Sequence, residues 1–547
     1  MKYILLTLLS AVLLSISWPT YGIPFFIFIA LVPLLLMEHD IAKFSKLKYK
    51  GWSVFGLALL CFLIWNSVTT GWLYGSKNPD GSNSVLAVVF PVVCNSLLYC
   101  LVFVLYHRFK RYMGTYWGMA FFAAIWMSFE KVHLGWEFSW PWLNLGNAFA
   151  DYPKLIQWYD TIGATGGSLW ILAINLMFFY TIRIWDASKK RNSLLKNVGI
   201  LILLIGVPMA ISLYKYSYFD EKPIGEVNVV LLQPDLDPYN EKYSKDSLTI
   251  LKELLTLAKE NSTKDTDFFI APETALPGYG SFSETGIEKS AVLDSIKLFL
   301  KDYPKASFET GISSHRFFIS DQNIPDGAYQ TSQGFWVESY NTAAQISSDK
   351  PIELYHKGKL VPGVEIFPYI NVLKPILGDA MLNLGGTVAS LGTDAERVSF
   401  ENSKNKGKFA PVICYESIYG EFVTDYIKKG ANFLGIMTND SWWGVSEGHR
   451  QLLSYAKLRA IETRREIARA ANSGISAHIN AKGEIEQDTL YGDQTALNAK
   501  IKLYDGITTY VKIGDLISRL GIFALGFMIF YSSFKWVQEK RQRKLKM

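Results

Sequence analysis

Three short segments of the chain place a reactive residue type beside an apolar, strand-like run. Glu273 follows the run Phe268–Ala271, and Cys414 follows the run Ala410–Ile413. Lys357 lies between them along the chain, in the sequence Tyr-His-Lys-Gly-Lys-Leu-Val-Pro. Functional sites of α/β domains gather at the carboxyl ends of strands, so these residues are the first candidates for a site.

Each candidate has a chemical role open to it and an unreactive alternative. Glu273, at the end of a buried strand, is expected to be partly desolvated, which raises its pKa and suits it to proton transfer; alternatively it is a surface-loop carboxylate. Lys357 can stabilise a developing oxyanion, oriented by Glu365, or belong to a solvated turn. Cys414 can be a nucleophile, with the N–H of Tyr415 facing an oxyanion, or a buried structural cysteine.

The four cysteines fall into two groups. Cys61, Cys94 and Cys100 lie in long apolar runs, where cysteine behaves as a small hydrophobic residue. Cys414 is the only cysteine of the polar part of the chain, so no disulfide can form within that part. A lone thiol in an oxidising compartment is a liability unless it reacts, which favours a chemical role. The motifs predict neither a metal nor a nucleotide cofactor.

The composition indicates a membrane protein, because 50% of the residues are hydrophobic and only 19% are charged. A span needs about 20 apolar residues. We expect eight transmembrane helices, near residues 3–18, 23–38, 52–73, 85–106, 116–129, 166–183, 198–214 and 516–534. A signal peptide is the alternative for residues 1–22, although a second apolar run follows it at once.

The basic residues predict how these helices are oriented. They are concentrated in alternate loops and in the C-terminal tail, at Lys43–Lys50, Arg108–Arg111, Lys189–Lys196 and Lys535–Lys546. Because basic loops stay in the cytoplasm, both termini are expected there and the polar segment 220–510 outside. The net charge of +6 is thereby explained without a nucleic-acid partner.

Residues 220–510 alternate between strand-like and helix-like pieces. Buried strands are expected at Val227–Gln233, Asp267–Ala271, Ala410–Ile413 and Asn432–Met437. Helices are expected at Ser247–Lys259 and at Gly448–Ala471, the second with solvent-facing charges at Glu462, Arg464, Arg465 and Glu466. This alternation predicts an α/β domain with a largely buried sheet.

The order Glu273, Lys357, Cys414, with the motifs around these residues, resembles the carbon–nitrogen hydrolase (nitrilase) superfamily. The flanking apolar runs narrow the resemblance to the apolipoprotein N-acyltransferases. The similar motifs are Pro272–Thr274, Lys357–Glu365, Ile413–Glu416, Thr438–Gly444 and Arg469–Gly474, with Ser139–Leu143 and Tyr510–Asp515 in the membrane half. In two departures, Gly363-Val364 replaces a phenylalanine-glycine, and a tryptophan of the family is absent from Asp237–Tyr243.

The resemblance implies a polytopic α-helical membrane domain of about eight spans plus an α/β nitrilase-like α-β-β-α sandwich domain. Residues 1–219 are expected to form the N-terminal transmembrane domain with seven spans. Residues 220–510 are expected to form an extracytoplasmic catalytic domain, and residues 511–547 the final span and a basic cytoplasmic tail. The implied location is the bacterial inner membrane, with the catalytic domain on the periplasmic side.

The resemblance also implies a reaction. Cys414 would take an acyl chain from a membrane phospholipid as a thioester and pass it to the α-amine of the diacylglyceryl-cysteine of an apolipoprotein. Glu273 would be the base, and Lys357 would stabilise the oxyanion. The implied supporting residues are Glu365, Tyr415 and Glu416. The implied partners are the bilayer, a phospholipid and a diacylglyceryl lipoprotein, with no nucleic acid and no cofactor; one chain holds a full site, so a monomer is expected.

Two other functions compete with this one. A membrane-tethered amidase would use the same three residues and pass the thioester to water, although eight spans exceed what soluble substrates require. A transporter or scaffold with an inactive soluble domain is expected to have lost one of the three residues, and all are present. The apolar stretch 366–391 is expected either to form an arm that admits lipid or to fill the core.

Overall fold

In the computed structural model, the chain forms two compact units. The helical unit comprises Met1–Gly71, Ala87–Ser217 and Ile513–Met547, and the sheet unit comprises Trp72–Leu86 and Tyr218–Lys512. A short segment between two expected spans thus belongs to the sheet unit. The structure describes all residues except 79–80, 220, 243, 279–280, 319–323, 326, 374, 376–389, 403, 405 and 546–547.

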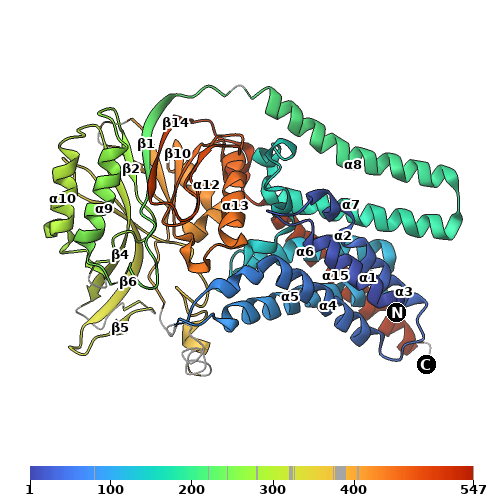
Figure 1. Ribbon diagram of the computed structural model, residues 1–547. Coiled ribbons are helices and arrows are strands. Elements are labelled where there is room, and N and C mark those ends of the chain that lie inside the picture. Colours follow the sequence, from blue (N-terminus) through green and yellow to red (C-terminus); the bar gives the residue numbers. More distant parts are fainter. Residues whose placement is uncertain are drawn as a thin grey trace. The chain divides into compact units, whose positions relative to one another are not determined.

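The helical unit has helices at all eight expected positions (Figure 1). They are α1 (Lys2–Ser15), α2 (Ile27–Ala30) with α3 (Val32–Lys43), α4 (Lys50–Thr70), α5 (Val85–Met113), α6 (Thr115–His133), α7 (Tyr159–Ser188), α8 (Arg191–Ser217) and α15 (Leu516–Leu545). In the described part of the chain, six helices are long and apolar enough to cross a membrane. The two remaining helices, α1 and α6, are not among the six, so those two spans stay predictions.

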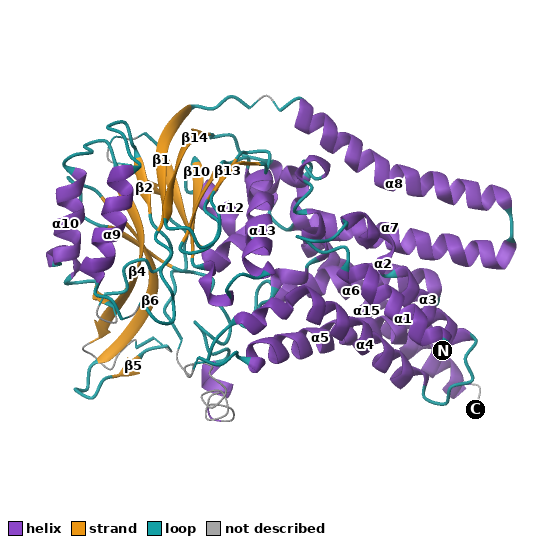
Figure 2. Ribbon diagram, in the orientation of Figure 1, coloured by secondary structure: helices purple, strands orange, loops and turns teal. Residues whose placement is uncertain are grey.

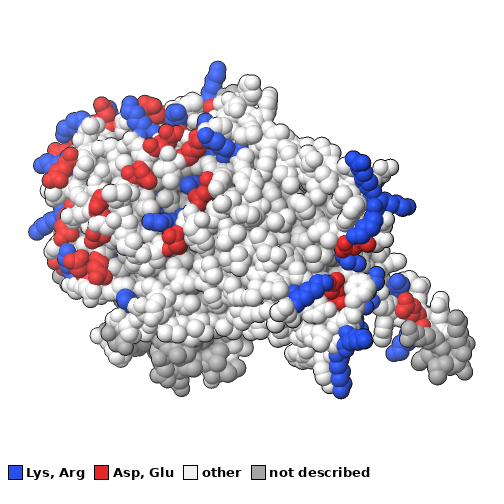
Figure 3. Space-filling view, turned by 45° about the vertical axis from the view of Figure 1, so that its right-hand side comes forward, with Lys and Arg blue, Asp and Glu red and all other residues white. Residues whose placement is uncertain are grey.

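Charge is distributed unevenly over the helical unit. Both chain termini lie at one end of it (Figure 1). Lysine and arginine side chains gather at this end, whereas the rest of its visible surface is almost free of charge (Figure 3). Such an uncharged flank suits contact with hydrocarbon, where a charged side chain is costly.

The sheet unit is built from two sheets with helices on their outer faces (Figure 2). The first sheet has the order β14-β1-β2-β4-β6-β5, with β3 paired to β4 and β7 paired to β6. Its strands are β1 (Gly225–Gln233), β2 (Phe268–Ile270), β3 (Phe282–Ser283), β4 (Ser307–Phe318), β5 (Tyr329–Gln330), β6 (Trp336–Ile346), β7 (Glu353–His356) and β14 (Thr495–Leu503).

The second sheet has the order β13-β12-β11-β10-β9-β8. Its strands are β8 (Phe400–Glu401), β9 (Lys408–Ile413), β10 (Phe433–Thr438), β11 (Ile467–Ala471), β12 (Ala477–Ile479) and β13 (Ile485–Asp488). Helices α9 (Ser247–Glu260) and α10 (Ala291–Leu300) pack on the first sheet, and α12 (Gly420–Lys428) and α13 (Glu447–Thr463) belong with the second. The expected combination of a helical membrane domain and an α-β-β-α sandwich is confirmed.

The helix α9 illustrates why these residues form these layers. Asp246 caps its first turn by accepting hydrogen bonds from the N–H groups of Leu248 and Thr249. Its buried face then recurs at helical spacing, at Ile250, Leu251, Leu254 and Ala258. This face enters the same core as Phe269 of β2. Helix and sheet therefore bury their apolar sides against each other, and the strand ends remain as the place for polar side chains.

The expected helix Gly448–Ala471 is wrong in its C-terminal third. The helix α13 ends at Thr463, Arg464 adopts a left-handed conformation with φ 51°, and residues Ile467–Ala471 form β11. The charged side chains expected to face solvent are instead buried. Their polar groups find partners inside the unit: Glu462 pairs with Arg459 at 2.8 Å, and Arg465 donates to backbone carbonyls. Charged side chains that satisfy buried backbone groups give the same sequence pattern as a solvent-facing side.

Candidate active site

Glu273, Lys357 and Cys414 all lie within the sheet unit, each just past the carboxyl end of a strand. Glu273 is the third residue after β2, Lys357 directly follows β7, and Cys414 directly follows β9. The three residues are 5%, 1% and 7% exposed, so the groups they carry are shielded from bulk water. Burial on this scale strengthens every electrostatic interaction among them.

Lys357 joins two carboxylates. Its Nζ donates to Glu273 Oε1 at 2.8 Å and to Glu365 Oε1 at 2.9 Å. Burial lowers the pKa of Lys357, but the two carboxylates outweigh it and raise that pKa well above the ordinary value. An ammonium has three N–H donors, and these two bonds leave one for another acceptor.

The pKa of Glu273 is lowered, contrary to the expectation of a raised value. Burial does raise it, but the charges of Lys357 and Lys242 and the hydrogen bonds from Lys357 and Asn341 outweigh that effect. A position at a strand end predicts the desolvation of Glu273 but not the two cations beside it. Glu273 is therefore an ionised carboxylate, which is the form able to accept a proton.

Asn341, on β6, was not singled out in the sequence. Its Nδ2 donates to Glu273 Oε1 at 2.8 Å and to Glu365 Oε1 at 2.9 Å, the same two atoms that Lys357 contacts. Glu365 Oε2 in turn accepts the N–H of Val361 at 2.9 Å. The two carboxylates are thus fixed from both sides, and no local motif around Asn341 predicts this.

Cys414 begins a sharp strand-to-helix turn. Its φ is 47°, in the left-handed region that non-glycine residues rarely adopt, and the short helix Cys414–Ile418 follows at once. Burial and the charge of Glu273 raise the pKa of the Cys414 thiol above its ordinary value, with Lys357 opposing them. The cysteine is therefore a neutral thiol at neutral pH, and a base is needed to make it a nucleophile.

The Cys414 sulfur lies 3.3 Å from the hydroxyl of Thr438, which is 2.9 Å from Asp440 Oδ1. Asp440 Oδ2 accepts a hydrogen bond from Arg469 at 2.8 Å. A carboxylate can only accept, so the Thr438 hydroxyl gives its hydrogen to Asp440 and presents a lone pair to the thiol. Among the described residues, no hydrogen bond joins Cys414 directly to Glu273.

Glu416 links the turn of Cys414 to the turn of Lys357. Its Oε2 accepts the N–H of Ile413 and the hydroxyl of Tyr426, both at 2.8 Å. Its Oε1 accepts the hydroxyl of Tyr355 at 2.7 Å and the N–H of Gly358 at 2.6 Å. With four donors and no exposure, this carboxylate holds the two turns together. Tyr415 is also buried, and its ring packs against Tyr419.

Asn472 ties together two of the family-like motifs. Its Nδ2 donates to the hydroxyl of Ser441 at 2.9 Å and to Asn439 Oδ1 at 3.2 Å, both in the Thr438–Gly444 motif. The same amide donates to the carbonyl of Leu236 at 2.6 Å and accepts its N–H at 3.2 Å. The loop after β1 is thereby fixed to the loop after β10.

The loop after β1 delivers a further residue that the sequence had not predicted. Lys242 is 1% exposed, and its Nζ donates to the carbonyl of Glu273 at 3.1 Å and to the hydroxyl of Thr274. The strand-end rule that selected Glu273 and Cys414 applies equally to this loop, since β1 and β2 are parallel. Applied to β1, that rule points to this loop but not to Lys242 itself, which is the ninth residue after the strand.

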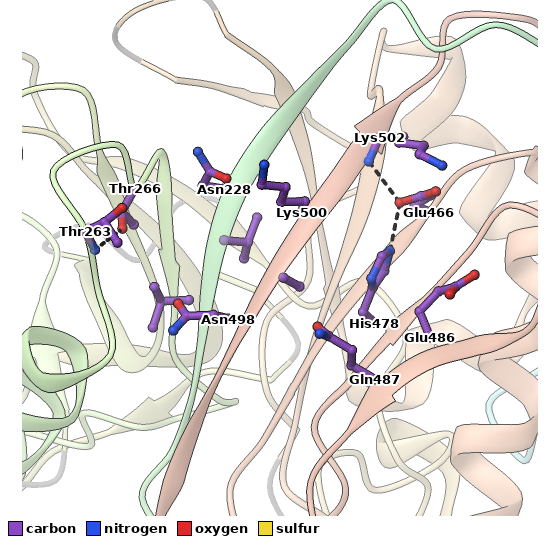
Figure 4. A pocket seen from close by; sticks show the side chains of 13 residues that line it. Asn228, Thr263, Thr266, Glu466, His478, Glu486, Gln487, Asn498, Lys500 and Lys502 are labelled. Carbon is purple, nitrogen blue, oxygen red and sulfur yellow. Dashed lines mark hydrogen bonds and ion pairs between the residues drawn. The ribbon is translucent and has the colours of Figure 1, made fainter.

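Two other regions add nothing to this site. Most of the stretch 366–391, expected to form a lipid arm or to fill the core, lies outside the described residues. A groove of about 650 Å³ crosses β14, and its lining includes Glu466, whose Oε2 lies 2.8 Å from His478 Nε2 (Figure 4). Glu273, Lys357 and Cys414 are not among the residues that line this groove.

Comparisons with known proteins cover both units. The apolipoprotein N-acyltransferase N-terminal domain matches residues 10–177, and the carbon–nitrogen hydrolase domain matches residues 232–502. Apolipoprotein N-acyltransferases are similar over most of their length: 28% identical in Chlorobaculum tepidum (95% of this chain, 94% of the relative), 27% in Geobacter metallireducens (94% and 92%) and 28% in Haemophilus influenzae (81% and 78%).

The two domain matches follow each other along the chain, and the second contains Glu273, Lys357 and Cys414. The apolar helices and these relatives together make the chain a multi-pass membrane protein. It belongs to the apolipoprotein N-acyltransferases of the carbon–nitrogen hydrolase superfamily.

Proposed function

We propose that this protein transfers an acyl chain from a membrane phospholipid, through a thioester on Cys414, to the α-amine of the diacylglyceryl-cysteine of an apolipoprotein. The observation that carries the proposal is the buried arrangement of Lys357, bonded to Glu273 and Glu365, beside a thiol at a sharp turn. The relatives' names supply the acceptor class, and the apolar helices favour substrates that are themselves lipids.

In the first half-reaction, Glu273 accepts the thiol proton of Cys414 while the sulfur attacks the carbonyl carbon of the phospholipid ester. Among the described residues, both hydrogen bonds to the Glu273 carboxylate end on Oε1, which leaves Oε2 to take the proton. The ester C–O bond then breaks, Glu273 returns the proton to the leaving oxygen, and a lysophospholipid departs. An acyl thioester remains on Cys414.

The negative charge on the carbonyl oxygen needs stabilisation while the tetrahedral intermediate exists. We assign this role to the third N–H of Lys357 and to the backbone N–H of Tyr415. Loss of one such donor typically slows an acyl transfer by about 100- to 1,000-fold. Glu365 holds Lys357 in place, and Glu416 keeps the two turns together.

In the second half-reaction, the α-amine of the diacylglyceryl-cysteine attacks the thioester carbonyl. Glu273 removes a proton from the attacking amine and gives it to the departing sulfur of Cys414, which restores the thiol. The products are the N-acylated lipoprotein and the free enzyme. Protons and charges balance across the two steps, so no cofactor enters either of them.

We place the sheet unit on the periplasmic side of the bacterial inner membrane. The support is the gathering of basic side chains at the end of the helical unit where both termini lie (Figures 1 and 3). We further propose that one chain is the functional unit, because Glu273, Lys357 and Cys414 all come from one sheet unit.

The test is the intact mass of the detergent-purified protein after incubation with phosphatidylethanolamine, for the wild type and for Cys414→Ala. An acyl adduct on the wild type alone, discharged by a diacylglyceryl peptide, is the expected result. Discharge by water as fast as by the peptide would instead favour an amidase-like hydrolase. Full acyl transfer by Cys414→Ala would show that the thiol is not the nucleophile.

A further inference from the structure

Two lysines, not one, are buried beside Cys414. Lys357 reaches the carboxylates from the turn after β7, whereas Lys242 comes from the loop after β1. Lys242 Nζ donates to the backbone carbonyl of Glu273 at 3.1 Å and to the hydroxyl of Thr274. The second lysine therefore contacts the backbone and neighbour of the base rather than its carboxylate.

The loop that carries Lys242 is held rigidly. The carbonyl of Asp237 accepts the N–H of Lys242 at 2.9 Å and the N–H of Glu241 at 3.1 Å. Asn472 fixes the preceding residue Leu236 through two hydrogen bonds. A lysine loses much side-chain freedom when it is buried, and a loop built in this way lowers the further cost of placing it.

Among Glu273, Glu365 and the lysines beside them, the charges balance only when Lys242 is included. Glu273 and Glu365 carry two negative charges, and Lys357 alone would leave a net charge of minus one in a buried site. An uncompensated buried charge is costly and opposes any further negative charge. With Lys242 the net charge is zero, and it stays zero when a proton moves from Cys414 to Glu273 as the oxyanion forms.

We propose that Lys242 is a second active-site cation, a positioning residue that balances the charges of Glu273 and Glu365 and fixes the turn of Glu273. This inference rests on the proposed acyl transfer through Cys414. Lys242 acts through Glu273, because its Nζ donates to the backbone carbonyl of Glu273 and to the hydroxyl of the neighbouring Thr274.

The titratable groups that face Lys242 support this role. They are Glu273 after β2, Lys357 after β7 and Cys414 after β9. Burial lowers the pKa of Lys242 to about 8, although the negative groups oppose the shift, so the side chain carries its charge at pH 7. Conversely, the charge of Lys242 helps to lower the pKa of Glu273.

The experiment compares Lys242→Gln, which can still donate hydrogen bonds, with Lys242→Arg, which keeps the charge. Lys245→Met is the matched control, since Lys245 lies nearby in the chain and pairs at the surface with Glu253. The readout is the single-turnover rate at which full-length protein in detergent acquires an acyl group from phosphatidylethanolamine, between pH 5 and 9. Thermal unfolding of each variant is recorded beside it.

We expect Lys242→Gln to acylate about 10- to 100-fold more slowly at pH 7, because a buried charge near the site is lost. Its acid limb moves to higher pH, since Glu273 loses a cation that lowers its pKa. Lys242→Arg restores most of the rate and the wild-type pH profile, and Lys245→Met matches the wild type. Lys242→Met serves as a second uncharged variant if the glutamine variant unfolds.

A wild-type rate and pH profile in both uncharged variants would overturn the proposal. So would an equal loss of rate in Lys242→Arg with an unmoved acid limb, which a purely structural role predicts. If the wild type itself acquires no acyl group on Cys414, the proposed function fails instead. The two failures are therefore distinguished by the wild-type sample.

Discussion

At the scale of single residues, two buried glutamates of the first sheet show how neighbours decide ionisation. Glu273 has Lys357 and Lys242 nearby, and its pKa is lowered despite burial. Glu309, on β4, has the neutral partners Gln345 and Ser307, and burial raises its pKa to about 8. The first is ionised at pH 7 and available as a base, whereas the second is mostly neutral and structural.

Glu309 should make the sheet unit less stable at alkaline pH. Its pKa is raised in the folded state from 4.5, so the folded state holds the proton more tightly than the unfolded one. Stability from this group is complete below pH 4.5 and falls by about 1.4 kcal/mol per pH unit until about pH 8. Glu309→Gln should therefore melt at a higher temperature than the wild type at pH 9, with a smaller difference at pH 6.

Differential scanning fluorimetry in detergent measures this difference. Glu396→Gln is the control, because Glu396 is an exposed carboxylate paired with Lys429 at the surface. An equal change in melting temperature for Glu309→Gln at both pH values would contradict the ionisation argument.

The candidate site could be predicted from the sequence only where its residues sit in local patterns. Glu273, Lys357 and Cys414 adjoin strand-like runs, so their places at strand ends followed from the chain itself. Asn341 lies in the middle of β6 and reaches Glu273 across the sheet, 68 residues away in sequence. Lys242 likewise contacts the turn after β2 from the loop after β1. Contacts between residues on different strands depend on the register of the sheet, which hydrophobic alternation does not reveal.

At the scale of elements, the turn after β2 depends on a glycine in the neighbouring strand. Gly311 of β4 donates its N–H to the carbonyl of Pro272 at 3.1 Å. A Cβ at this position would lie 2.2 Å from the backbone nitrogen of Thr274, which no side chain tolerates. The close approach of β4 therefore sets where Glu273 sits.

Gly311→Ala should displace the turn and slow acylation of Cys414 by at least about tenfold, since small misplacements of catalytic groups are costly. Gly225→Ala is the matched control, because it is also in a strand of the first sheet and its Cβ would meet nothing closer than 3.8 Å. Single-turnover acylation of both variants provides the comparison. Wild-type acylation by Gly311→Ala would mean that the turn is not held from β4.

Of the fourteen strands in the described part of the chain, the apolar runs predicted β1, β2, β9 and β10, since strands buried on both faces read as continuous apolar runs. The order of the layers was implied by the family resemblance. The end of α13 could not be predicted from the sequence, because Arg464 takes the left-handed conformation that glycine usually adopts at a helix end. Its neighbours Arg465 and Glu466 are charged yet buried. They form hydrogen bonds with groups far away in the sequence, such as the carbonyl of Ala431 and the ring of His478. Helical periodicity alone predicts that such charged residues face solvent.

At the scale of the whole molecule, the sheet unit is assembled from separated parts of the chain. The segment Trp72–Leu86, which connects α4 to α5, belongs to it together with Tyr218–Lys512. Trp72 donates from Nε1 to Gln451 at 3.1 Å, and its ring meets that of Trp443 edge to face. A fragment that begins at residue 218 would therefore lack part of its own unit.

The proposed orientation predicts which positions can be labelled from outside the cell. Leu490 is 73% exposed on the sheet unit, and Lys190 is exposed between α7 and α8. In cells with a permeabilised outer membrane, an impermeant maleimide should label Leu490→Cys at least about tenfold more than Lys190→Cys, because the inner membrane excludes the reagent. After lysis both should react, and the wild type gives the background of the native cysteines. Stronger labelling of Lys190→Cys than of Leu490→Cys before lysis would show that the sheet unit faces the cytoplasm.

The strands β1 and β14 begin and end the large segment of the sheet unit, and they pair with each other antiparallel from Gly225↔Leu503 to Gln233↔Thr495. Both connections to the helices α8 and α15 therefore leave from the same end of one strand pair. Tension between these helices would separate β1 from β14 one residue pair at a time, starting at Gly225↔Leu503. Force applied in this direction loads the hydrogen bonds of the pair one after another, so the pair resists it less than it would resist a pull along the strands.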